Sequence, residues 1–187
     1  MKTLIGVVFA LFAGGLPCFA QDAAVKSEPQ MLHNYFVSTF GPSGLAHATV
    51  FSAWAQRQNA PPQWGTGTQG YSKRWVSKFA ESAIGNTAKF GVARLFHHDP
   101  SFVKCDCTGF GRRLRHAVVS PYVARARDGH QVFSSASLAG FVTGHLVAKT
   151  TWYPDGGPGR VIRDAGVSLA VTTGMDVFKE FRPRSKK

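Results

Sequence analysis

Clusters of proline and glycine interrupt this chain at regular intervals and constrain its fold more than any other feature. Both residues end regular secondary structure, proline by lacking an N–H group and glycine by its conformational freedom. The segments between the clusters are about 16 to 26 residues long, which is too long for ordinary strands and suits helices. The clusters are Gly41-Pro42, Pro61-Pro62, Asp99-Pro100, Asp128-Gly129, residues 154–159 and Pro183. The sequence therefore predicts an all-α fold, a compact bundle of about five helices.

The expected elements follow from these boundaries and from the spacing of apolar residues. In the second long segment Val76, Phe79 and Ala83 recur three and four residues apart, as on one face of a helix. Residues 167–172 also alternate in the way of a strand, but aspartates on both sides and the lack of an Asn-Gly turn nearby favour a helix there. We expect a turn over 31–40 and helices over 43–58, 71–97, 110–127, 133–152 and 160–181.

Small residues recur four apart in four of the proposed helices. A glycine inside a helix costs about 1 kcal/mol relative to alanine, so these positions need a reason. Close approach of two helix backbones supplies one, although an Ala- and Gly-rich composition can also produce such a stripe by chance. Four stripes in one chain favour helix faces closely packed through Gly, Ala and Ser. They are Gly44, Ala48 and Ser52; Ala83, Thr87 and Gly91; Ala136, Gly140, Gly144 and Ala148; Gly166, Ala170 and Gly174.

The amino end has the three-part layout of a secretory signal. Lys2 precedes an apolar run over 4–13, and small residues precede a cleavage site after Ala20. We therefore expect 1–20 to be a signal peptide, 21–30 a flexible linker, 31–182 one helical domain and 183–187 a basic tail. The protein is then exported, to the periplasm or the outer envelope of a bacterial-type cell.

The chain is strongly basic, with 22 Lys and Arg against 10 Asp and Glu, and without residues 1–20 its formal charge is +11. Such a charge favours contact with anionic surfaces, although it also fits a basic face that only keeps the protein soluble. For an exported protein the expected partners are anionic lipid head groups or envelope polysaccharide, and no nucleic acid is expected. Residues 131–148 lack charged side chains but are too polar for a confident membrane span, which favours peripheral attachment to a membrane.

Two groups of basic residues are candidates for binding an anion. Three arginines follow a glycine turn at 109–111 that is expected to open a helix, where backbone N–H groups attract anions. The second group lies beside Tyr71 and Trp75, an aromatic and cationic mixture that suits a membrane interface and equally the rim of a core. The predicted anion-binding residues are Arg112, Arg113, Arg115, Lys73 and Arg74.

The densest group of reactive side chains consists of His97, His98, Cys105, Cys107 and His116. Imidazole and thiolate groups bind zinc or copper, but the C-x-C spacing matches no established zinc pattern. In an oxidising compartment the two cysteines can instead form a short-loop disulfide or pair with another chain, and the whole cluster can be incidental. No particular cofactor is indicated.

Catalytic signatures such as G-x-S-x-G and H-E-x-x-H are absent from the sequence. An enzyme is therefore the least favoured class of function. We expect a non-enzymatic binding or structural protein that associates with anionic surfaces of the cell envelope. The alternative is a periplasmic metal-binding or thiol-redox protein built on the cluster between His97 and His116.

Overall fold

A computed structural model describes residues 26–152 and 158–183 of the chain. Within them lie six α-helices, two short 3₁₀ turns and one two-stranded hairpin, which confirms the all-α bundle. The helices are α2 (Glu28–Phe40), α3 (Pro42–Arg57), α4 (Thr68–Leu95), α5 (Phe110–Val119), α6 (Ser135–Thr151) and α7 (Pro158–Phe181). The 3₁₀ turns are η1 (Pro62–Trp64) and η2 (Ser120–Tyr122), and the strands are β1 (Val123–Arg125) and β2 (Gln131–Phe133). The expected signal peptide, residues 21–25 of the expected linker and residues 184–187 of the basic tail lie outside the described residues.

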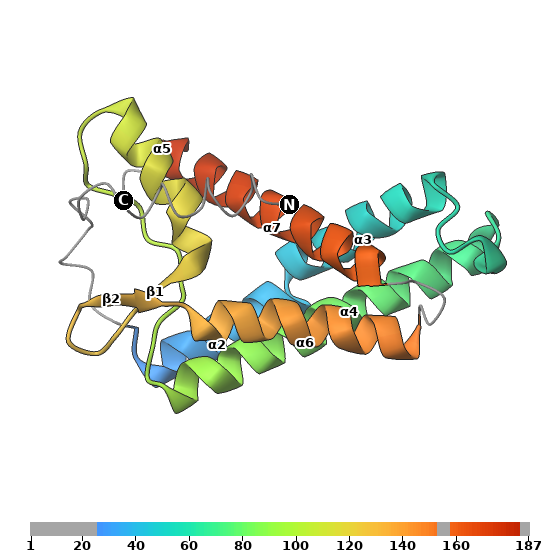
Figure 1. Ribbon diagram of the computed structural model, residues 1–187, viewed down its shortest axis with the longest axis horizontal. Coiled ribbons are helices and arrows are strands. Elements are labelled where there is room, and N and C mark those ends of the chain that lie inside the picture. The colour runs from blue at the N-terminus through green and yellow to red at the C-terminus, as the bar shows by residue number, and fades with distance from the viewer. Residues whose placement is uncertain (1–25, 153–157, 184–187) are drawn as a thin grey trace.

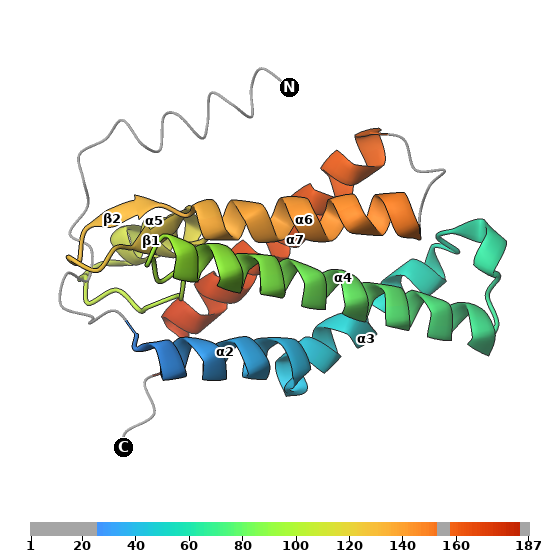
Figure 2. The same ribbon diagram turned by 90° about the horizontal axis from the view of Figure 1, so that it is seen from below.

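The long helices form rows along the long axis of the molecule (Figure 1). Figure 2 shows α6, α4 and the consecutive pair α2–α3 as three such rows, with α7 crossing them obliquely. Helix α4 packs against α2, α3 and, most extensively, α6. The hairpin and α5 lie together at one end of the bundle, where α5 packs against the last turns of α7 (Figure 1).

Helix α2 begins earlier than expected, at Glu28, and replaces both the end of the expected linker and the expected turn over 31–40. Ser27 is its N-cap residue, and the Gln30 side chain accepts a hydrogen bond from the Ser27 N–H at 3.1 Å. This is one half of a capping box, and Pro29 in the first turn strengthens the start of the helix. The sequence signal Ser-x-x-Gln was present and outweighs the polar composition of the segment.

The helix expected over 110–127 is shorter, because α5 ends at Val119 and β1 follows. Pro121 cannot continue the helix, since it has no N–H to donate. Strand β1 pairs antiparallel with β2, with Arg125 opposite Gln131. Asp128 and Gly129 make the turn, and Gly129 has a φ of 84°, a conformation that glycine adopts without strain. An Asp-Gly pair between two strand-forming runs is a hairpin signal.

Two of the four small-residue stripes are buried as predicted. The stripe on α3, from Gly44 to Ser52, faces the interior, and so does the stripe on α6, from Ala136 to Ala148. A Cβ atom on Gly140 would lie 2.8 Å from the carbonyl oxygen of Gly85, and one on Gly85 would lie 2.9 Å from the carbonyl oxygen of Gly140. The backbones of α4 and α6 therefore touch at a point where only glycine fits.

The prediction was wrong for the other two stripes. Thr87 and Gly91 are exposed, because α4 turns a neighbouring row of residues inward. That row runs through Ser77 and Glu81 toward Gly85 and holds the polar groups that meet α6 and the loop before α4. On α7 the whole stripe of Gly166, Ala170 and Gly174 is exposed to solvent.

The side chains of the described residues are distributed unusually for a soluble domain. Apart from Pro61 and Pro121, the buried apolar side chains are Cys105 and six alanines, whereas seven ionisable side chains are buried. Many large apolar side chains are exposed, from Leu32 on α2 to Phe178 on α7. Among the described helices, none combines the length and hydrophobicity that crossing a membrane requires. The buried ionisable residues are Arg74, Glu81, Asp99, Arg125, His145, Asp176 and Glu180.

Candidate functional site

The histidines of the predicted metal or redox cluster are not brought together. His97 is exposed just after α4, and its Nδ1 lies 2.9 Å from a guanidinium nitrogen of Arg127. The ring of His98 stacks on Phe96, 6.1 Å between ring centres, and its buried Nδ1 has no hydrogen-bond partner among the described residues. No group of three or more His, Cys, Asp or Glu side chains in the described part of the chain could hold a metal ion. The described residues therefore give no support to the metal alternative.

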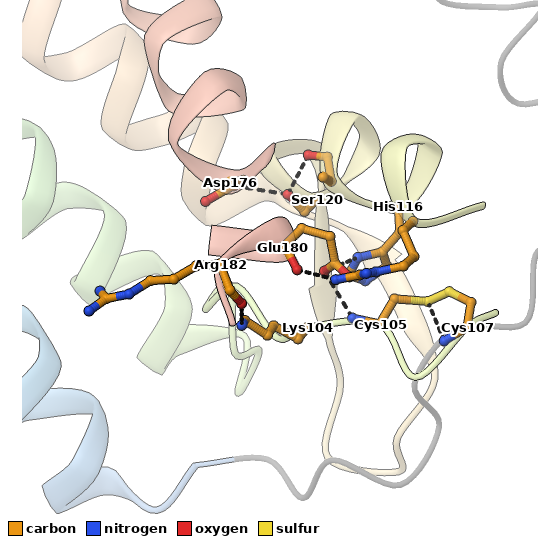
Figure 3. A network of polar contacts seen from close by, with 10 residues as sticks. Lys104, Cys105, Cys107, His116, Ser120, Asp176, Glu180 and Arg182 are labelled. Atoms are coloured by element: carbon orange, nitrogen blue, oxygen red, sulfur yellow. Dashed lines mark hydrogen bonds and ion pairs between the residues drawn. A yellow bond between two sulfur atoms is a disulfide. The ribbon is translucent and has the colours of Figure 1, made fainter. Parts of the chain in front are cut away.

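The two cysteines of the cluster do come together, as the disulfide Cys105–Cys107 (Figure 3). Their Cα atoms are 5.2 Å apart, inside the usual range for bridged cysteines. Cys105 is buried and accepts a hydrogen bond from the Cys107 N–H at 3.2 Å. Cys107 is part-buried and is therefore the more accessible sulfur for thiol exchange.

A buried carboxylate, Glu180 on the last turn of α7, organises this end of the bundle (Figure 3). Its side chain is fully buried and accepts hydrogen bonds from the Cys105 N–H and from Arg113 Nε, both at 3.0 Å. His116 Nδ1 lies 3.6 Å from the other carboxylate oxygen. Burial lowers the pKa of His116, against the opposing effect of the Glu180 charge. Sequence reasoning missed Glu180, and its one available signal was the acid Asp176 four residues earlier on the same helix face.

The three arginines of α5 have different surroundings. Arg113 is bound to the Glu180 side chain and backbone carbonyl, and its guanidinium lies 4.7 Å from the centre of the Phe181 ring. Arg115 is part-buried, and Arg112 is exposed. Of the three, Arg112 is the one whose side chain is exposed enough to meet an external anionic surface.

Arg74 serves the fold, whereas its neighbour Lys73 is exposed. The Arg74 guanidinium is fully buried, and all of its nitrogens donate to acceptors of the loop before α4 or of the end of α3. The carbonyls of Ala60 and Pro61 each accept at 2.9 Å, and the Gly65 carbonyl accepts at 2.6 Å. We therefore leave Arg74 out of any surface for an external anion.

A second buried ionic group joins α4 and α6. Glu81 accepts from His145 Nδ1 at 2.6 Å and from Lys78 Nζ at 2.7 Å. Burial raises the pKa of Glu81, but the hydrogen bond from His145 and the charge of Lys78 outweigh it and hold the pKa below its ordinary value. The carboxylate is thereby kept charged inside the helix pair, where it ties the two helices together.

The sequence also contains one S-x-x-K spacing, Ser101 to Lys104, which in some hydrolases supplies a nucleophile and its base. Residues three apart are neighbours on a helix, but this segment is not helical. Lys104 Nζ instead donates to the carbonyl of Arg182 at 2.5 Å. The spacing is therefore not assembled into a nucleophile and base.

These arrangements neutralise buried charges and fix the ends of helices. A carboxylate, an arginine and a histidine meet around Glu180, and a carboxylate, a lysine and a histidine meet around Glu81. The outer surface, with its apolar and basic side chains, is the feature that the packing of the chain leaves unexplained. Comparisons with protein-family models, with curated proteins and with solved structures found no match to this chain.

Proposed function

We propose that this is an exported, non-enzymatic protein that attaches peripherally to an anionic lipid surface of the cell envelope through the outer face of α7. The observation that supports the proposal most directly is a row of exposed apolar residues along that helix. Residues four apart lie on one helix face, and every residue of the row is exposed, with Ile162 at 68 % and Phe178 at 62 %. The row consists of Ile162, Gly166, Ala170, Gly174 and Phe178.

Cations flank this row. Arg163 lies near its start, and Lys179 and Arg182 lie near its end, all exposed. The start of α5 adjoins the same end, because the Phe110 and Phe181 rings lie 5.1 Å apart. Exposed Arg112 follows Phe110 by two residues and adds a further cation there. An apolar face bordered by cations is the pattern of helices that lie in a membrane interface.

Burial of acids makes the outer surface more positive than the composition indicates. Four carboxylates are buried, against two arginines. The groups that remain outside are therefore enriched in Lys and Arg. Each Lys or Arg near an anionic bilayer contributes about 1 kcal/mol to attachment, so several acting together are sufficient for peripheral binding.

The apolar row favours lipid over polysaccharide as the anionic partner. Removing apolar surface from water stabilises a complex by about 25 cal/mol per Å². The boundary between head groups and acyl chains offers both hydrocarbon and charge, whereas a polysaccharide offers mainly charge and hydroxyl groups. Exposed apolar patches of this kind mark membrane or protein contacts.

Co-sedimentation of the mature chain with lipid vesicles tests the proposal. The protein should bind vesicles of anionic phosphatidylglycerol, bind neutral phosphatidylcholine more weakly, and lose part of its binding as salt rises, because salt screens exposed charges. Replacing Ile162 and Phe178 together by Ser should weaken binding at every salt concentration. Val76→Ser removes an equally exposed apolar side chain from α4 and should change little, which makes it the matched control.

Three results would count against the proposal. Equal binding to both kinds of vesicle removes the role of charge. Binding to a soluble anionic polysaccharide but not to vesicles identifies the other surface. The exposed small residues of α7 also suit a second copy of the chain. If analytical ultracentrifugation shows a dimer that the α7 double variant dissociates, while vesicle binding is unchanged, then the face is used for self-association.

A thiol-redox role is the second candidate, and the Cys105–Cys107 disulfide is the observation that favours it. Redox-active pairs have reduction potentials of about −120 to −270 mV, whereas structural disulfides lie below about −300 mV. Equilibration of the purified protein with glutathione buffers measures this potential. A potential below about −300 mV, together with unchanged vesicle binding after replacement of both cysteines by Ser, would show that the disulfide is purely structural.

A further inference from the structure

A cavity of about 550 Å³ that is open to solvent lies between α2, α4, α6, α7 and the segment that follows α4. Its volume lies within the range of about 300–1,000 Å³ that is usual for small-molecule sites. Part of its wall is aromatic, with Tyr35 stacked on Phe90 at 5.1 Å between ring centres and Phe141 nearby. Sequence patterns do not predict this space, because its walls come from segments far apart in the chain.

Lys89 on α4 lines the cavity beside its aromatic part. Its side chain starts at the contact between α4 and α6, where a Cβ on Gly140 would lie 3.0 Å from Lys89 Cβ. Its amine has no hydrogen-bond or ion-pair partner among the described residues, although it responds to the charges of Asp176, Lys179 and Asp99. Lys89 is half-buried, and burial lowers the pKa of its amine.

The acids on the cavity wall already have their own bases. Asp176 accepts from Lys179 Nζ and from Ser120 Oγ, both at 2.9 Å. Asp99 is buried and lies 3.4 Å from a guanidinium nitrogen of Arg125.

Several neutral polar groups on the wall are paired as well. The Asn86 amide, for example, donates to Thr39 Oγ1 at 3.1 Å. The amines of Lys89 and Lys26 are therefore the charges of the wall that have no partner among the described residues, and Lys89 is the one that stands next to Phe90 on α4.

We propose that this cavity binds a small amphiphilic anion, with the anionic group on the Lys89 amine and the apolar part against Tyr35, Phe90 and Phe141. A charged head and an apolar body match the two kinds of surface that the wall presents. A cation would meet the Lys89 charge at close range, and an uncharged molecule would leave it unpaired. A medium-chain carboxylate is the simplest molecule that meets these requirements.

Isothermal titration calorimetry with dodecanoate below its micelle concentration, without vesicles, tests the inference on the mature chain. We expect saturable binding of one dodecanoate, with dodecyltrimethylammonium at least tenfold weaker. Lys89→Met keeps the length of the side chain and removes its charge, so it should weaken dodecanoate by about 10- to 100-fold, the range for hydrogen bonds between charged groups. Lys73→Met is the matched control, because Lys73 is exposed on the same helix.

Circular dichroism and thermal melting accompany the titration. Lys89→Met should fold and melt close to wild type, because the half-buried amine that it removes has no partner among the described residues. If it fails to fold, Lys89→Gln replaces it. The inference is overturned if wild type does not bind dodecanoate, if both amphiphiles bind equally, or if the Lys89 variant binds as tightly as wild type. None of these results depends on attachment to a bilayer, so the inference and the proposed function can fail separately.

Discussion

The contact between the backbones of α4 and α6 makes Gly140→Ala a sharp test of the packing. An alanine Cβ at this position would lie 2.8 Å from the Gly85 carbonyl oxygen and 3.0 Å from Lys89 Cβ. Ordinary contacts of a Cβ atom begin near 3.4 Å, so the two helices must separate to admit the methyl group. Overpacking of this kind costs about 1–3 kcal/mol.

The intrinsic helix preference of alanine acts in the opposite direction and must be separated from the steric cost. Alanine favours a helix interior by about 1 kcal/mol over glycine. Gly91 on α4 supplies the matched control, because a Cβ atom there meets nothing within 4 Å. Gly91→Ala should therefore stabilise the protein by up to about 1 kcal/mol, while Gly140→Ala should lower its stability by about 0–2 kcal/mol.

The difference between the two variants, about 1–3 kcal/mol, isolates the steric term because the helix preference is common to both. Urea unfolding followed by circular dichroism measures it, with equal denaturant slopes as the check that both unfold alike. Gly85→Ala should resemble Gly140→Ala, since a Cβ there would lie 2.9 Å from the Gly140 carbonyl oxygen. If Gly140→Ala and Gly91→Ala stabilise the protein equally, the two helices do not touch at Gly85 and Gly140 and the reasoning is wrong.

Two further predictions concern buried polar groups. Arg74→Lys should lower the free energy of unfolding by about 2–4 kcal/mol, because an ammonium cannot donate to acceptors on several sides, such as the Ala60 and Pro61 carbonyls. The control Lys73→Gln should change the free energy of unfolding by no more than about 0.5 kcal/mol, and urea unfolding measures both variants. Because burial lowers the pKa of His116, the unfolded chain takes up this proton first as the pH falls through about 6.5, so stability should decrease toward pH 5. His116→Gln should reduce the fall in melting temperature from pH 7 to pH 5, to which His47 also contributes because burial lowers its pKa as well. An unchanged fall would show that His116 does not contribute to it.

Helix positions were predictable from the sequence because proline and glycine act locally. Helix α6 was expected over 133–152 and runs over Ser135–Thr151, and α3 was expected over 43–58 and runs over Pro42–Arg57. The errors also have local causes. The Ser27 capping box and the Asp128-Gly129 turn are local sequence signals for a helix start and a hairpin, and they outweigh the polar composition of 21–30 and the length of the segment 110–127.

The partners of individual side chains could not be predicted, because they are set by tertiary packing. Arg113 and Glu180 are 67 residues apart in the chain and meet only because α5 packs on the end of α7. The small-residue stripes show the same limit. A four-residue spacing identifies a face that is able to pack closely, but whether a neighbour covers that face depends on how the helix is rotated, as Gly91 on α4 and Gly140 on α6 demonstrate.

The polar interior and the apolar exterior together predict that this protein is more stable on a lipid surface than in water. Alanine buries little apolar surface compared with leucine or phenylalanine, so an interior of alanines contributes less hydrophobic stabilisation than an ordinary core. Close backbone contacts and paired charges, such as Glu180 with Arg113, must then hold the helices together. Large side chains such as Phe178 remain in contact with water, and covering them by a lipid surface would add the apolar burial that the interior lacks. Any partner that binds the folded form alone raises its stability by mass action, so anionic vesicles should raise the melting temperature of this protein more than neutral vesicles do.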